Sequence, residues 1–97
     1  MLITAYVSGS KDGMIFETLE QFLTEIKKKG SKIIRAKLTL IGDKIGGVKA
    51  LAEAIRNPDC QLTRLNLLNS KIGADGAVIL AEALKDPNCK LTSLDLR

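Results

Sequence analysis

Residues able to do chemistry are few in this chain. It has no His, so general acid or base work would fall on carboxylates, lysines, Tyr6 and two thiols. The carboxylates Glu53 and Glu82 stand 29 residues apart, each in an Ala-Glu-Ala context, which indicates equivalent surface positions on two similar helices and not a matched acid and base. The sequence therefore predicts a protein that is not an enzyme and uses no cofactor.

The two cysteines, Cys60 and Cys89, are also 29 residues apart, each two residues after a proline. Without His, and without a second Cys at local ligand spacing, no metal is expected. A disulfide is the less favoured alternative. Their matching surroundings favour two small apolar side chains packed under equivalent turns.

Positive charge is concentrated near the end of the first third of the chain. Residues 1–37 hold seven Lys or Arg against four Asp or Glu, whereas residues 38–97 hold eight against seven. A basic segment over 27–37 could bind nucleic acid or an acidic surface. However, no aromatic residue is interleaved with it to stack on bases, and cations suit a helix end followed by a loop. Neither nucleic acid nor a membrane is the expected partner.

Two further patterns exclude function classes. The segment from Ser8 to Gly13 lacks the spacing of a phosphate-binding loop and is predicted to be a turn. No apolar run is long enough to cross a bilayer, and the first residues lack the features of a secretion signal. These patterns predict a cytoplasmic protein, with export by a route that reads no such signal left open. The length of 97 residues and 45% apolar content fit one domain over residues 1–97.

An internal repeat organises residues 38–97. Residues 51–62 recur at an offset of 29 as residues 80–91, including Leu-Ala-Glu-Ala followed by an aliphatic residue, then Pro and Cys. The preceding leucines Leu38 and Leu40 recur at an offset of 27 as Leu65 and Leu67. A third copy begins at Leu91. The expected units are residues 38–64 and 65–93, followed by a truncated last strand over 94–97.

Each unit is predicted to hold one strand and one helix. Leu65 and Leu67 share the period-2 face of a strand, and Gly73 and Gly76 permit the turn that follows. Apolar residues then recur at helical spacing until Asp86 and Pro87 end the helix. The expected buried stripe of that helix is Ala77, Leu80, Ala81 and Leu84. Such units bury both apolar faces only when stacked.

The segments Leu62-x-x-Leu65-x-Leu67-x-x-Ser70-x-Ile72-Gly73 and Leu80-Ala-Glu-Ala-Leu84 resemble leucine-rich repeats of the ribonuclease-inhibitor-like kind. The resemblance covers residues 38–97. It implies an α/β fold, a short leucine-rich-repeat solenoid of alternating strands and helices, with a parallel sheet on the concave face and helices on the convex face. The chain departs from the family where Asp43 and Ser70 replace the usual Asn. Members of the family are mostly recognition modules, so the resemblance implies a protein–protein interaction module.

Residues 1–37 are predicted to form a degenerate repeat or N-terminal cap. A strand is expected over 2–7 and a helix from about Met14 to Lys29, with Asp12 as a candidate N-cap. The expected buried stripe of this helix is Ile15, Leu19, Phe22, Leu23 and Ile26.

The candidate binding site is the concave face of the predicted sheet. Stacking would bring Ile41 and Leu68 together as an exposed apolar pair, flanked by Lys37 and Arg64. Mixed apolar and Arg content is typical of a surface that anchors a partner, although solvated sheet residues would have the same pattern. The residues expected on this face are Lys37, Thr39, Ile41, Arg64, Asn66, Leu68, Ser93, Asp95 and Arg97.

The last strand, Leu94 to Arg97, is predicted to leave an open edge, and exposed edges recruit other strands. Three functions follow from these patterns. The first is a module that presents its sheet to an unidentified protein partner. The alternatives are a self-associating fragment of a longer solenoid, through the open C-terminal edge, and a weak nucleic-acid or acidic-surface binder through the Lys27 to Lys37 region.

Overall fold

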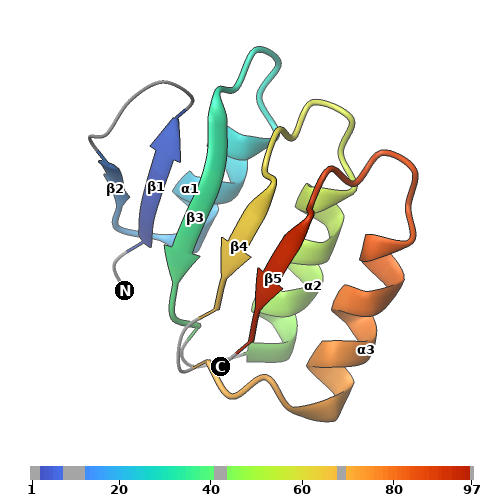
Figure 1. The fold of residues 1–97 in the computed structure, drawn as a ribbon. Helices are drawn as coiled ribbons and strands as arrows, with labels where there is room; N and C mark the ends of the chain where they lie inside the picture. The colour runs from blue at the N-terminus through green and yellow to red at the C-terminus, as the bar shows by residue number, and fades with distance from the viewer. Residues whose placement is uncertain (1–2, 8–12, 41–43, 68–69, 97) are drawn as a thin grey trace.

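Five strands form one sheet, and three helices cover one of its faces, within the residues that the computed structural model describes: 3–7, 13–40, 44–67 and 70–96 (Figure 1). The order of strands across the sheet is β2-β1-β3-β4-β5. Within these ranges, no helix lies on the opposite face of the sheet (Figure 1). The elements are β1 (Ile3–Val7), β2 (Gly13–Phe16), α1 (Leu19–Ile26), β3 (Ile33–Leu38), α2 (Lys44–Ile55), β4 (Arg64–Asn66), α3 (Gly73–Leu84) and β5 (Ser93–Asp95).

The sheet is mixed, so the predicted solenoid with a parallel sheet is wrong. β1 pairs antiparallel with both β2 and β3, while β3, β4 and β5 are parallel. The connection from Val7 to Gly13 is too short for a parallel crossover, which needs about a dozen residues or more. The chain therefore turns back into β2, and this additional reversal makes β3 run opposite to its neighbour β1.

The expected helix from Met14 to Lys29 is wrong in its first part. Residues 13–16 form strand β2, and Ile15, expected in the buried stripe, is 68% exposed. α1 begins at Leu19, after the N-cap Thr18, whose hydroxyl accepts a hydrogen bond from the Gln21 amide at 3.1 Å. The candidate cap Asp12 lies outside the described residues. The β2 segment is apolar and uncharged, so it gains more by pairing with β1 than by extending a short helix.

The parallel strands are in register at an offset of 29. Arg35 lies opposite Arg64, which lies opposite Ser93. The alignment of Leu38 with Leu65, at an offset of 27, is therefore wrong by two residues. Two threonines reinforce the 29-residue register, because Thr63 Oγ1 donates to the Ile34 carbonyl at 3.1 Å and Thr92 Oγ1 donates to the Thr63 carbonyl at 3.2 Å.

α3 begins earlier than the sequence indicated. Gly73 and Gly76 belong to the helix and not to the preceding turn. Gly73 has a φ of +72°, which favours glycine because it has no Cβ. The helix buries Gly76, Leu80 and Ala83, whereas Ala81 and Leu84 of the expected stripe are exposed.

We expect Gly76→Ala to destabilise the fold by about 1 kcal/mol. The added Cβ would lie 2.8 Å from Ile72 Cβ, and overpacking of this kind costs about 1–3 kcal/mol, against a gain of up to about 1 kcal/mol in helix propensity. Gly47→Ala in α2 is the matched control, since its Cβ would meet the flexible end of Leu40 at 3.3 Å. Urea unfolding of both variants measures the difference. A Gly76→Ala chain at least as stable as Gly47→Ala would contradict the close contact.

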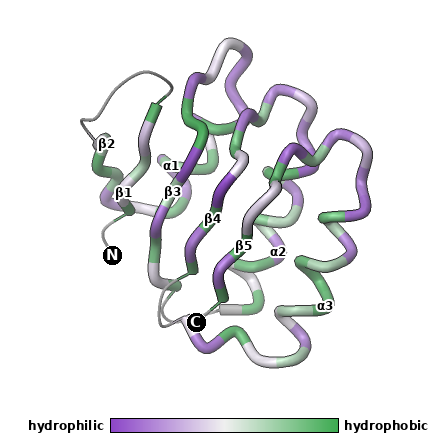
Figure 2. Tube along the Cα trace, in the orientation of Figure 1, coloured by the Kyte–Doolittle hydropathy of each residue, from purple (hydrophilic) through white to green (hydrophobic). Residues whose placement is uncertain are grey.

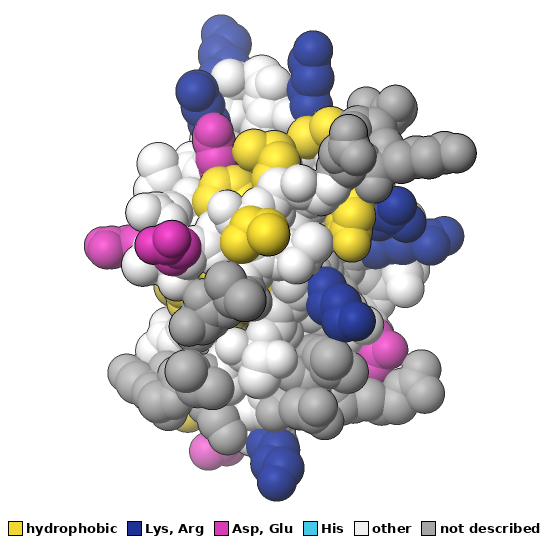
Figure 3. Space-filling model, turned by 90° about the vertical axis from the view of Figure 1, so that its left-hand side faces the viewer, with side chains coloured by type: hydrophobic (Ala, Val, Ile, Leu, Met, Phe, Trp, Pro, Cys, Tyr) yellow, Lys and Arg dark blue, Asp and Glu magenta, His cyan; other side chains and the backbone are white. Residues whose placement is uncertain are grey.

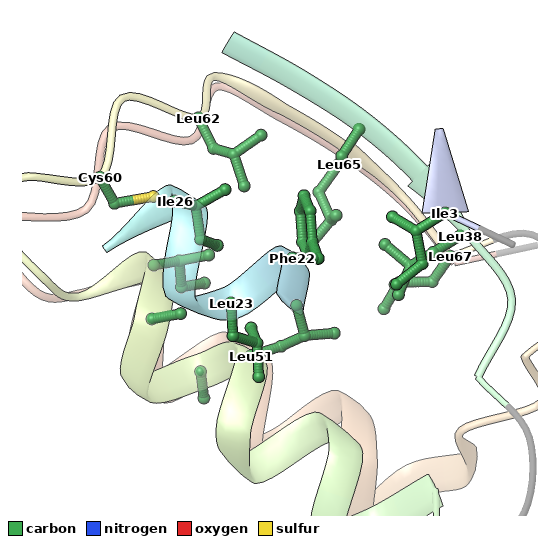
Figure 4. Packing of buried hydrophobic residues seen from close by; sticks show 14 of the residues in the cluster. Ile3, Phe22, Leu23, Ile26, Leu38, Leu51, Cys60, Leu62, Leu65 and Leu67 are labelled. Carbon is green, nitrogen blue, oxygen red and sulfur yellow. The ribbon is translucent and has the colours of Figure 1, made fainter. Parts of the chain in front are cut away.

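The core lies between the sheet and the helices. Phe22, Leu23 and Ile26 of α1 point at leucines from the strands and α2 (Figure 4). Hydrophobic and hydrophilic residues alternate along β3 and β4, so that one side of each strand faces this core (Figure 2). Cys60 is buried in it as a free thiol, and burial raises the pKa of that thiol. Cys89, also a free thiol, is half-buried and packs against the core.

The helices are all short. α1 has 8 residues, and α2 and α3 have 12 each. In the described ranges, no helix has the length and apolar content needed to span a bilayer.

Candidate functional site: the helix-free face of the sheet

Two rows of side chains cross the face of the sheet that no helix covers. In one row, β1, β3, β4 and β5 contribute Tyr6, Arg35, Arg64 and Ser93 in register. The next row, two residues along each strand, contains Thr4, Lys37, Asn66 and Asp95. Side chains alternate between the faces of a strand, so the intervening Ala5, Ala36, Leu65 and Leu94 point toward the helices.

A hollow of about 380 Å³ lies on this face. Its lining joins strands that are far apart in the sequence, from β1 to β5. Within it, we define the basic face as the residues Tyr6, Arg35, Lys37, Arg64, Asn66, Ser93 and Asp95.

Arg35 is held in place by Tyr6. The carbon at the centre of the guanidinium group lies 4.6 Å from the centroid of the Tyr6 ring, within the range of a cation–π interaction. Gly13 on β2 leaves room for this ring, because a Cβ there would approach Tyr6 Cε1 to 3.3 Å. The ring covers one flat face of the guanidinium and not its N–H edges, which are the groups that bind an oxyanion.

Among the described residues, three cations of the basic face form no ion pair with an acidic side chain. Arg35, Lys37 and Arg64 are exposed. In the described ranges, the ion pairs are on the helices and the turns after them, between Arg56 and Asp86 at 3.2 Å and between Lys85 and Glu82 at 3.7 Å. The basic face therefore has a positive charge that is not neutralised by these residues.

Asn66 presents an unused hydrogen-bond acceptor. The residue is half-buried, and its Oδ1 atom is shielded from solvent and has no hydrogen-bond partner within the described ranges. An acceptor left in this state costs about 1–3 kcal/mol relative to one that is paired. Because Oδ1 is shielded, a donor on a ligand in the hollow would reach this atom only if the Asn66 side chain turned.

The structure brings together five of the nine residues expected on the binding face. Lys37, Arg64, Asn66, Ser93 and Asp95 all line the hollow. Thr39 is half-buried, follows the end of β3 and is not among the lining residues. The remaining three, Ile41, Leu68 and Arg97, lie outside the described residues, and so does the expected Ile41–Leu68 contact.

Sequence reasoning missed Arg35 and Tyr6. Arg35 stands 29 residues before Arg64, so the offset seen in the helices would have found it if it had been applied to the strands. No comparable signal marks Tyr6, because its place depends on β1 pairing antiparallel with β3.

The basic segment from Lys27 to Lys37 does not form one surface. Lys27 is the C-cap of α1, and the next lysines follow it in the connection to β3. The last turn of α1 therefore contains no basic residue, contrary to the expectation of cations at this helix end. Arg35 and Lys37 instead belong to β3 and to the basic face. Arg35, in this second part of the segment, lies over an aromatic ring, that of Tyr6.

The chain matches no protein-family model, no curated protein and no solved structure. The resemblance of residues 38–97 to ribonuclease-inhibitor-like repeats therefore stays a prediction.

Proposed function

We propose that this chain is a recognition module that binds a partner protein through the basic face. The observation that carries the proposal is a sheet face without a helix, on which Arg35, Lys37 and Arg64 converge without acidic partners in the described part of the chain. Charge complementarity indicates an acidic segment of the partner as the ligand.

Arg35 and Arg64 are the expected carboxylate-binding residues. They lie directly opposite each other on neighbouring parallel strands, which are about 4.8 Å apart. Like charges in such a pair are destabilising. A carboxylate between them would replace this repulsion by two charge-assisted contacts, and an arginine can bind a carboxylate through two parallel hydrogen bonds.

Asn66 favours a peptide as the source of the carboxylate. Asn66 lines the same hollow, and a turn of its side chain would let the amide bond to a peptide backbone and give the buried Oδ1 a donor. An extended peptide supplies backbone N–H groups next to its acidic side chains, so it could satisfy the arginines and Asn66 together.

Single-stranded nucleic acid is the second candidate, and one observation favours it. The Tyr6–Arg35 stack places a guanidinium plane beside two further cations, and bases stack on Arg planes as well as on aromatic rings. Phosphates would then contact Arg64 and Lys37. The two candidates differ in their sensitivity to nuclease.

We expect Arg64→Glu to weaken partner binding about tenfold, equivalent to about 1.4 kcal/mol, which is the lower end for a hydrogen bond to a charged group. Affinity capture from a cell lysate, with quantitative mass spectrometry, compares the unmodified chain with this variant. Lys49→Glu is the matched control, because it makes the same charge change at an exposed position of α2.

The protein proposal predicts partners that are lost with Arg64→Glu, kept with Lys49→Glu and unaffected by nuclease. Loss after nuclease treatment would support the nucleic-acid candidate instead. Equal losses with both variants, or no specific capture by the unmodified chain, would contradict a role for the basic face.

A further inference from the structure

Strand β2 is a short open edge of the sheet that carries neither a charge nor a proline. The strand order places it at one end, with β1 as its neighbour. Soluble proteins usually blunt such an edge with a charge or a proline, whereas residues 13–16 are Gly-Met-Ile-Phe. Met14 is 38% exposed and Ile15 is 68% exposed. Hydrophobic side chains gather on this side of the molecule (Figure 3).

A hollow lies beside the same edge, on the helix side of the sheet. Its volume is about 900 Å³, and it lies between the end of β2 and the exposed side of α1. Met14 points to the helix side, because its register partner Ala5 is buried in the core. The lining residues are Phe16, Thr18, Glu20, Gln21, Thr24, Glu25 and Lys28.

We propose that a second copy of this chain pairs with β2, antiparallel and across a two-fold axis perpendicular to the sheet. Such a contact joins two sheets into a single sheet of twice the number of strands. It gives each β2 backbone the hydrogen-bond partners that an edge lacks.

The pattern of β2 fits a pairing with itself. Opposite residues in antiparallel strands must share a face, so Ile15 can pair only with Ile15 or Gly13 of the second copy. The pairing of Ile15 with Ile15 also sets Met14 opposite Phe16 of the second copy. In that register both exposed apolar side chains are covered, and each Met14 lies next to the hollow lined by Phe16 of the other copy.

The charges around the hollow are compatible with the same axis. A two-fold axis perpendicular to the sheet sets the two α1 helices antiparallel on the same side. The rim carries both signs, from Glu20 and Glu25 and from Lys28, so acids of one copy can face the lysine of the other. The opposite edge strand, β5, consists of Ser93, Leu94 and Asp95. It carries a charge, and its one apolar side chain, Leu94, is half-buried.

Light scattering after size-exclusion chromatography tests the proposal. We expect the mass to rise toward twice 10.5 kDa with increasing concentration. Ile15→Lys places two ammonium groups opposite each other at the axis and should weaken association at least tenfold. Val78→Lys, at a 61% exposed position of α3, should leave the association unchanged. Circular dichroism confirms that both variants are folded.

A second variant tests the register without weakening the fold. Opposite Cβ atoms in an antiparallel pair are about 4.5–5.5 Å apart, near enough for a disulfide after a small adjustment. Ile15→Cys should therefore form a disulfide-linked dimer on mild oxidation, whereas Val78→Cys and the parent chain should not.

Three outcomes would overturn the proposal. The first is a monomeric mass for the unmodified chain at millimolar concentration. The second is a dimer that survives Ile15→Lys but dissociates on Leu96→Lys, because this result would locate the contact at the β5 edge predicted from the sequence. The third is equal cross-linking of Ile15→Cys and Val78→Cys.

Discussion

Replacing Phe22 with alanine is expected to lower the free energy of unfolding by about 3–5 kcal/mol. The Phe22 side chain is fully buried, and its ring meets the ring of Phe16 edge-to-face, with centroids 5.7 Å apart. α1 has only 8 residues, too few for a helix to persist in water without packing. Phe22 therefore stabilises both the core and the position of α1 against the sheet.

The loss would be a large part of the total, since small domains unfold with about 5–15 kcal/mol. Urea titration followed by circular dichroism measures it. Val78→Ala removes apolar atoms from a position that is 61% exposed, and it should change stability by less than about 0.5 kcal/mol. Similar midpoints for the two variants would show that α1 is not anchored by Phe22.

The sequence predicted the C-terminal half of the fold better than its N-terminal half. Residues 51–62 and 80–91 are close copies, and helices α2 and α3 with the turns after them are in equivalent places. Because the two copies can be aligned with each other, the pattern they share could be recognised from this one sequence. Residues 1–37 have no such copy, and only local periodicity was available to interpret them.

The error at β2 has a physical cause. Ile15, Leu19, Phe22 and Ile26 stand at spacings of four, three and four, which is the pattern of one helix face. The pattern is real from Leu19 onward. At Ile15 the backbone instead pairs with Thr4 of β1, and pairing between separate segments leaves no mark in the local spacing.

Much of the basic face could be predicted from period 2 alone. Leu65 must face the core, so Arg64 and Asn66 must face away, and the same reasoning places Ser93 and Asp95. The register between strands could not be obtained this way. Because the strands were aligned at an offset of 27 and not 29, Arg35 was not placed beside Arg64 and was left out of the predicted site. Tyr6 belongs to the basic face because β1 pairs antiparallel with β3. The repeats of residues 38–97 could not indicate this pairing.

Ser70→Ala is expected to cost about 1–3 kcal/mol although it removes a single oxygen. Ser70 is 1% exposed, and its hydroxyl oxygen accepts a hydrogen bond from the Leu40 amide at 2.8 Å. This contact joins the segments that follow β3 and β4, at a position where the resemblance to leucine-rich repeats leads one to expect Asn. Alanine would leave the buried amide without its acceptor, because Leu40 is only 2% exposed.

Hydrogen exchange at the Leu40 amide separates this effect from general destabilisation. In the Ser70→Ala chain this amide should exchange faster by a larger factor than amides in the centre of α2, which report global unfolding. Ser93→Ala, at an exposed serine of β5, should alter neither exchange nor stability. If the Leu40 amide slowed or kept pace with α2 in the Ser70→Ala chain, the hydroxyl would not be its acceptor in solution. The short side chain of Ser70 would then fill space in the core without joining the two segments.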